Sequence, residues 1–75
     1  MAKQQGERLI GKFDGVDTAQ QILQVAKWEH DTLHFVVEWK ERGNIKPLQS
    51  IETSDMVRSK CPRELVEFYK SIIIN

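Results

Sequence analysis

The residues from Thr32 to Lys40 alternate between apolar and mostly polar side chains, and this alternation limits the possible folds more than any other feature of the chain. The odd positions carry Leu33, Phe35, Val37 and Trp39. A period of two is typical of a β-strand that is buried on one side only. We therefore expect this segment to be a strand whose odd positions face the core.

Two more strands are expected beside this central one. Residues 20–28 carry apolar side chains on both faces of an extended segment, and a turn over residues 29–31 joins them to the central strand. Residues 41–44 read as a hairpin loop. Residues 45–49 form the expected third strand, where Pro47 has no N–H to donate and so favours an edge of the sheet. These segments predict a three-stranded antiparallel sheet.

Two helices are expected after the sheet. The side-chain oxygen of Thr53 or Ser54 can accept a hydrogen bond from a free amide of a first helical turn that ends near Ser59. Pro62 suits the first position of a second helix that runs to about Ile73, because its fixed φ is already helical there. The predicted fold class is α+β, with a three-stranded antiparallel sheet packed against two C-terminal helices.

Length and composition limit how such a fold is stabilised. The chain has 75 residues, of which 40% are apolar, so it fits one domain with a thin core. Domains of this size often depend on a disulfide, a metal or a second copy of themselves. Cys61 is the only cysteine, which excludes an internal disulfide and a Cys-rich zinc site. Association with another chain is therefore the expected source of extra stability.

The first 14 residues are mostly polar and include Gly6 and Gly11. We expect residues 1–14 to be a flexible lead-in that adds at most a short strand. The folded domain is expected over residues 15–75.

Charge and hydropathy disfavour several classes of partner. Eleven basic and eleven acidic residues leave no formal net charge, whereas a domain that grips nucleic acid usually has an excess of Lys and Arg. No window approaches the roughly 18 apolar residues of a membrane span, and the N-terminal residues lack the apolar run of a signal peptide. Together with the single thiol, these features predict an intracellular domain that binds neither nucleic acid nor membrane.

The second helix carries more apolar surface than a small sheet can cover. On a helical wheel Leu65, Phe68, Tyr69 and Ile72 share one side, and Val66 and Ile73 widen the apolar arc to roughly 160°. A stripe of about 100° is enough to cover a sheet. The excess predicts a protein interface, and the alternative is that the short helix and the lead-in bury the whole arc. Ile74 falls on the polar side, so Ile74 and Asn75 are expected to begin an extended tail.

Three motifs give the chain a family resemblance. They are Lys60-Cys61-Pro62 followed by Phe68-Tyr69, the strand from Leu33 to Lys40, and Gly15-Val16-Asp17 leading to Ile22-Leu23. Together they resemble the chromoshadow domain of the heterochromatin protein 1 family, from Gly15 to about Ile74. The resemblance implies a non-catalytic, cofactor-free module of a nuclear chromatin protein.

The same resemblance implies how the module would bind its partners. It implies a homodimer formed through the second helix and a groove across the two-fold axis for extended Pro-x-Val-x-Leu peptides. By position, Val66 falls at the centre of the dimer contact, with Leu65, Tyr69, Lys70 and Ile73 around it. The partner is then a peptide or domain of a chromatin or silencing factor, including factors of small-RNA pathways.

The chain departs from the family at the tail. A family tryptophan that packs on the bound peptide falls at Asn75 here, so we expect ordinary Pro-x-Val-x-Leu peptides to bind weakly or not at all. Partner contacts are expected from Ile73, Ile74 and Asn75. A second expected partner site lies on the sheet, formed by Trp28, His34 and Val36.

Other chemistries have weaker support. His30 and His34 lack further Cys or His neighbours, so a metal site is not expected. Cys61 has no histidine or oxyanion loop near it in sequence, so catalysis is not expected either. The alternative function is a monomeric, chromodomain-like reader of methylated lysine or nucleic acid. An aromatic cage of Trp28, Phe35 and Trp39 would serve a methyl-lysine reader, but Phe35 and Trp39 are needed in the core.

Overall fold

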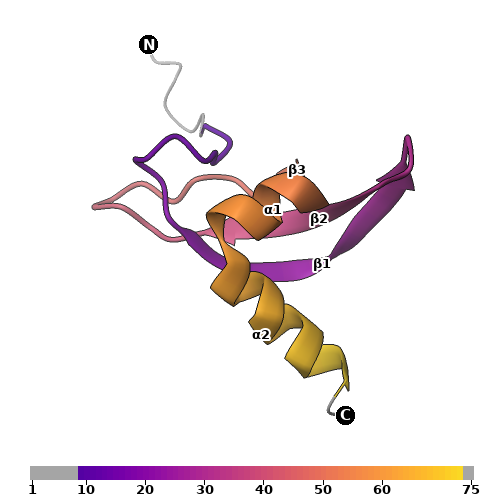
Figure 1. The fold of residues 1–75 in the computed structure, drawn as a ribbon. Helices are drawn as coiled ribbons and strands as arrows, with labels where there is room; N and C mark the ends of the chain where they lie inside the picture. The colour runs from indigo at the N-terminus through magenta and orange to yellow at the C-terminus, as the bar shows by residue number, and fades with distance from the viewer. Residues whose placement is uncertain (1–8, 74–75) are drawn as a thin grey trace.

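Three antiparallel strands form one sheet in the order β1-β2-β3, and two helices follow them in the chain (Figure 1). The computed structural model describes residues 9–73. The elements are β1 (Ala19–Glu29), β2 (Thr32–Trp39), β3 (Ser50–Thr53), α1 (Ser54–Lys60) and α2 (Pro62–Ile73). The predicted fold class is confirmed. No helix within residues 9–73 is long and apolar enough to cross a membrane.

The core lies on one face of the sheet, under both helices. Phe35, Val37 and Trp39 of β2 have no exposed surface, and Leu33 is partly buried against them. This confirms that the odd positions of the alternating segment face inward. Three further buried side chains join the same cluster, namely Val57 of α1, Leu65 of α2 and Cys61 between the two helices.

Strand β1 is irregular, with eleven residues opposite the eight of β2. Its inward side is formed by residues three apart, because Ala19, Ile22, Val25 and Trp28 pair with Trp39, Val37, Phe35 and Leu33. Three register shifts, each inserting one extra residue, produce this spacing. The bulges explain why the sequence of β1 shows no regular alternation.

A tight turn closes the hairpin between β1 and β2. His30 and Asp31 have φ values of 52° and 59°, and Glu29 pairs with Thr32. Two consecutive left-handed residues are typical of a two-residue hairpin turn whose twist matches that of the strands. The predicted turn is therefore confirmed, with its two central residues at 30 and 31.

The predicted third strand over residues 45–49 is wrong, since β3 begins at Ser50. Arg42 and Ile45 instead bond to each other around a turn, and the N–H of Leu48 is taken by the carbonyl of Leu9. Pro47 is buried and has no N–H for a ladder. The chain can therefore join β2 only after this loop, where Ser50 pairs with Val37.

The described part of the lead-in, residues 9–14, contacts the rest of the domain. Gly11 donates its N–H to the carbonyl of Leu48 at 2.9 Å, and the ring of Phe13 meets that of Trp39 edge-on at 4.8 Å. A Cβ on Gly11 would overlap the Trp39 indole, so only glycine fits there. This segment covers one end of the core. Residues 1–8 lie outside the described residues.

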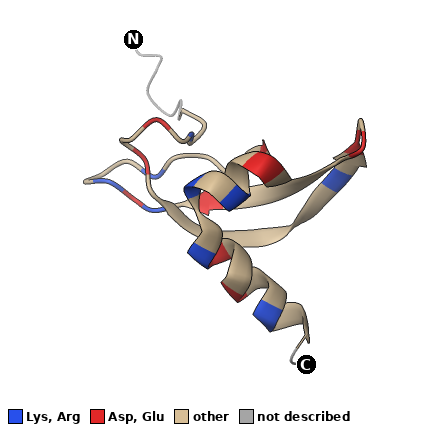
Figure 2. Ribbon diagram, in the orientation of Figure 1, with Lys and Arg blue, Asp and Glu red and all other residues tan. Residues whose placement is uncertain are grey.

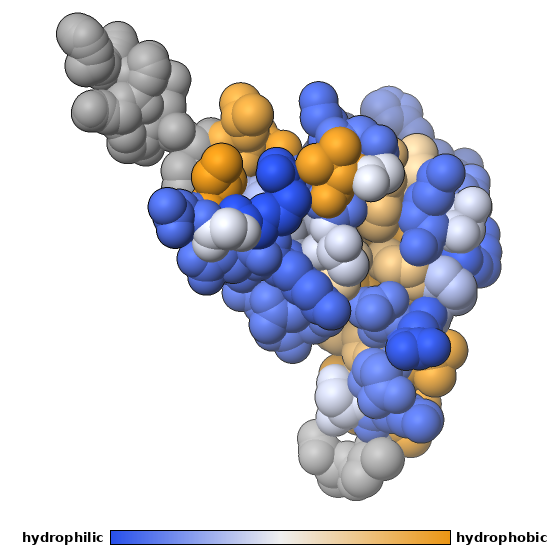
Figure 3. Space-filling view, turned by 90° about the vertical axis from the view of Figure 1, so that its left-hand side faces the viewer, coloured by the Kyte–Doolittle hydropathy of each residue, from blue (hydrophilic) through white to orange (hydrophobic). Residues whose placement is uncertain are grey.

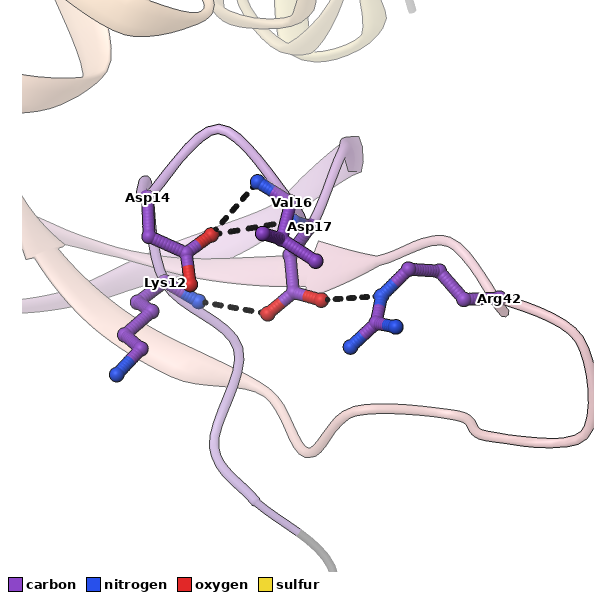
Figure 4. Close-up of polar contacts among 5 residues, drawn as sticks. All are labelled: Lys12, Asp14, Val16, Asp17 and Arg42. Atoms are coloured by element: carbon purple, nitrogen blue, oxygen red, sulfur yellow. Dashed lines mark hydrogen bonds and ion pairs between the residues drawn. The ribbon is translucent and has the colours of Figure 1, made fainter.

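A network of polar contacts holds the end of this segment in place (Figure 4). One carboxylate oxygen of Asp17 accepts the Nε–H of Arg42 at 2.9 Å, and the other accepts the N–H of Lys12 at 3.3 Å. Asp14 accepts the N–H groups of Val16 and Asp17. These two backbone hydrogen bonds hold the pKa of Asp14 below its ordinary value. Through Asp17, this network links the lead-in to the loop between β2 and β3.

The two helices begin as the sequence predicts. Thr53 caps α1, because its hydroxyl oxygen accepts the N–H of Met56 at 3.2 Å. Cys61 separates the helices and donates its N–H to the carbonyl of Val57 at 2.8 Å. Pro62 is the first residue of α2, and the helix ends at Ile73.

Candidate functional site

Helix α2 is covered on only part of its apolar arc. Leu65 is buried and Phe68 is partly buried, and both belong to the core or pack against it. Val66, Tyr69 and Ile73 remain exposed over 51%, 40% and 76% of their surface. The alternative in which the whole arc is buried is therefore wrong. Apolar side chains reach the surface along one side of the lower part of the molecule in Figure 3.

We call Val66, Tyr69 and Ile73 the α2 stripe. They are spaced by three and four residues, so they form one continuous row on the helix. Lys70 stands beside the row, with its ammonium group 3.7 Å from the Glu67 carboxylate. The row is apolar and flanked by charge, which is the composition of a protein interface with a polar rim.

An aromatic cluster holds Tyr69 in place. Its ring centroid lies 6.4 Å from that of Phe35 and 5.9 Å from that of Phe68, and the two phenylalanine rings are 5.9 Å apart. Edge-on and tilted contacts of this kind favour one orientation of the ring. The centre of the α2 stripe is thus packed against the core of its own chain.

The predicted dimer residues therefore separate into two groups. Leu65 is a core residue of its own chain, at 8% exposure, whereas Val66, Tyr69, Lys70 and Ile73 are accessible. Of the predicted tail contacts, Ile74 and Asn75 lie outside the described residues.

The predicted sheet site does not form as one surface. In β2, His34 and Val36 point away from the helices, and Val36 pairs with the exposed Ile51 of β3. Trp28 pairs with Leu33, however, and so lies on the helix-bearing face. Sequence reasoning grouped Trp28 with His34 and Val36, whereas the two-residue turn at His30 and Asp31 sets Trp28 opposite Leu33 on the core face.

The open face of the sheet is largely polar around Val36 and Ile51. Gln21 donates a hydrogen bond of 2.6 Å to Glu38, and the Lys46 ammonium group lies 3.8 Å from the same carboxylate. The Nδ1 of His34 lies 3.0 Å from the carbonyl oxygen of Thr32. The polar groups around Val36 and Ile51 are thus paired with one another within the chain.

The described residues support neither catalysis by Cys61, nor a metal site, nor an aromatic cage for methylated lysine. Burial raises the pKa of the Cys61 thiol to about 11, and the charges of Glu64 and Glu52 act in the same direction, so the reactive thiolate is suppressed. No group of three or more His, Cys, Asp or Glu within residues 9–73 can hold a metal ion. Phe35 and Trp39 are fully buried and so unavailable to a methyl-lysine cage.

Charge is dispersed over the molecule. Basic and acidic residues are interspersed on both helices and in the loops, as the view in Figure 2 shows. Affinity for a nucleic acid backbone depends on clustered positive charge. The distribution therefore favours a protein partner over a nucleic acid.

Comparison with known families agrees with this geometry. Residues 4–73 match the family model of the chromo shadow domain. The chain belongs to the chromo shadow domain family. Chromo shadow domains are non-catalytic modules that mediate dimerisation and protein interaction in chromatin proteins. Comparison with curated proteins and with solved structures gave no significant match.

The match to the chromo shadow domain begins before Gly15, where the sequence resemblance begins. The structure gives the reason, since Gly11 and Phe13 pack against Trp39. Sequence reasoning missed both residues as parts of the domain. The available signal was a glycine two residues before the one aromatic side chain of a mostly polar segment.

Proposed function

We propose that this chromo shadow domain forms a homodimer through the α2 stripe and that the dimer docks a protein partner in the nucleus. The observation that carries the proposal is the exposure of Val66, Tyr69 and Ile73 in a row on α2, beside the exposed Ile72, while Leu65 and Phe68 pack in or against the core. Water contact with such a row is unfavourable, and burial against a second copy removes it.

Symmetry assigns a role to each residue near the stripe. A two-fold contact is self-complementary, so a residue on the axis meets its own copy. We place Val66 there, with Tyr69 and Ile73 on either side and Lys70 at the rim. Leu65 supports the helix from beneath as a core residue and makes no direct contact.

Dimerisation would serve function in two ways. It links two copies of any reader domain attached to this one, so that the second binding event becomes intramolecular and avidity rises. It also creates a composite surface on which Ile73 and the tail of Ile74 and Asn75 would meet a peptide or domain of a chromatin or silencing factor. Factors of small-RNA pathways belong to this class.

The test is the solution mass of the native chain and of Val66→Glu, measured by light scattering over a concentration series. Two carboxylates facing each other in an apolar contact are strongly unfavourable. We expect a native dimer and a folded V66E monomer at micromolar concentration. Val16→Glu is the matched control, because Val16 is exposed to 55% but lies outside α2. A V66E protein that stays dimeric would refute the proposed contact.

A monomeric native chain would refute dimerisation altogether. The alternative function, a monomeric reader of methylated lysine, would then be favoured. Titration of the chain with methylated histone peptides would test it. The two results separate a wrong contact from a wrong assembly.

A further inference from the structure

We propose that the end of the β1–β2 hairpin forms a second part of the dimer interface, where Trp28, Val25 and Leu33 are covered by α2 of the partner copy. This inference rests on the proposed dimer. It adds a contact on the sheet that sequence and family membership do not assign.

The inward face of the sheet is longer than the layer that covers it. Four residue pairs follow one another along this face, and the first two, Ala19 with Trp39 and Ile22 with Val37, are buried. In the next two pairs the β1 residues, Val25 and Trp28, are not covered by the helices. Val25 is 45% exposed and Trp28 is 66% exposed, although both share the face of the core. A large aromatic side chain therefore extends the core face into solvent.

The α2 stripe faces this uncovered end. Phe68 lines a small hollow together with Gln20 and Gln21, near the start of β1. Tyr69 is the next residue and contacts Phe35, which pairs with Val25 further along the hairpin. Phe68 also contacts Phe35, at 5.9 Å between ring centroids, but the hollow lies on the side of α2 that carries Glu64, Glu67 and Ser71. Tyr69 lies on the other side of the helix, away from the start of β1.

Val66 and Ile73 share the Tyr69 side, because they lie three residues before and four residues after it. The α2 stripe and the end of the β1–β2 hairpin are consequently the two sides, or walls, of one open angle between the helix and the sheet. We call this angle the corner. In Figure 1 the hairpin and the C-terminal end of α2 diverge, and this divergence gives the corner its opening.

The corner is apolar. Lys27 and Glu29, the neighbours of Trp28 in the strand, pair with His34 and Thr32 on the open face, where they form an ion pair of 2.9 Å with each other. An apolar wall of Trp28, Val25 and Leu33 favours an apolar helix over a charged peptide. The α2 stripe of a second copy has this character and is held in place by the Tyr69 cluster.

Area also favours a second copy that touches both walls. The three partly exposed side chains of the α2 stripe offer far less than the about 800 Å² that each partner buries in a standard interface. Trp28 alone adds roughly 150 Å² of apolar surface. In a two-fold arrangement each α2 enters the corner of the other copy, so both hairpin ends are covered at once.

The test compares the dimer dissociation constants of the native chain and of Trp28→Ala by sedimentation. Because Trp28 is mostly exposed in the single chain, the variant is expected to fold, and the proposal predicts a dissociation constant at least tenfold higher. Ile45→Ala is the matched control: Ile45 is 51% exposed and lies in the loop between β2 and β3. We expect it to change the constant less than twofold.

Tryptophan fluorescence gives a second readout on unmodified protein. Trp39 is fully buried, so a concentration-dependent change in emission or in quenching by iodide reports on Trp28. We expect Trp28 to become protected as the dimer forms, and to stay accessible in V66E at the same concentration.

The outcomes separate the two proposals. A native dimer that V66E dissociates, but in which Trp28→Ala has no effect and Trp28 stays accessible to iodide, would overturn this inference and leave the α2 contact standing. A native chain that stays monomeric would overturn both.

Discussion

The indole Nε1 of Trp39 donates a hydrogen bond of 3.0 Å to the hydroxyl oxygen of Ser50 on the neighbouring strand. Trp39 is fully buried and Ser50 is exposed to only 7%, so this polar contact lies inside the core. The Ser50 hydroxyl in turn donates to the Glu52 carboxylate at 2.8 Å. The chain of hydrogen bonds fixes β3 against the end of β2 and satisfies an indole that water cannot reach.

Ser50→Ala should therefore destabilise the fold. The substitution leaves a buried N–H without an acceptor, which costs about 1–3 kcal/mol of unfolding free energy. Urea denaturation at one fixed protein concentration measures the loss, since the proposed dimerisation would make stability depend on concentration. Ser59→Ala, at an exposed position of α1, is the control and should change stability by less than about 0.5 kcal/mol. An S50A protein as stable as this control would contradict the prediction.

Gly11→Ala tests whether the lead-in is part of the folded domain. The new Cβ would overlap the Trp39 indole, and the buried ring has no room to move. Overpacking of this kind costs about 1–3 kcal/mol. The loss should appear in urea denaturation, and the exposed neighbour Lys12 changed to alanine is the control. No loss in G11A would mean that residues 9–14 detach freely, as the sequence alone predicts.

Cys61 should make stability fall at high pH. Desolvation raises the pKa of its thiol to about 11 from an ordinary value of 9.0. The folded state thus favours the neutral thiol, and this contribution is complete below pH 9 and is lost as the pH rises to about 11. Urea denaturation across that range should show a decline in the native chain that is smaller in Cys61→Ala. An equal decline in both proteins would show that other groups are responsible.

The native chain should bind Pro-x-Val-x-Leu peptides weakly. The family tryptophan that packs on such peptides falls at Asn75, and an aromatic anchor often contributes 2 kcal/mol or more. Asn75→Trp should therefore strengthen binding at least tenfold in calorimetric titrations, while a peptide lacking the valine serves as control. Low-micromolar binding by the native chain would show that the anchor is dispensable.

Local patterns in the sequence determined the central strand and the helix starts. The alternation around Phe35 and Val37 needs only its own periodicity to predict a buried face, and Thr53 and Pro62 act within a single helical turn. The apolar arc of α2 was equally visible, because the angle between helical positions is fixed by backbone geometry.

Contacts between distant segments were decided only by the tertiary structure. Val25, Ile22 and Ala19 share the core face with Trp28 because three bulges shift β1 against β2, and no local pattern carries that register. Strand β3 begins at Ser50 because the backbone of Leu48 is already bonded to Leu9 and Gly11, which lie far away in sequence. Register and coverage depend on which distant segments fill the hydrogen bonds and the volume around a residue, so folding itself decides them.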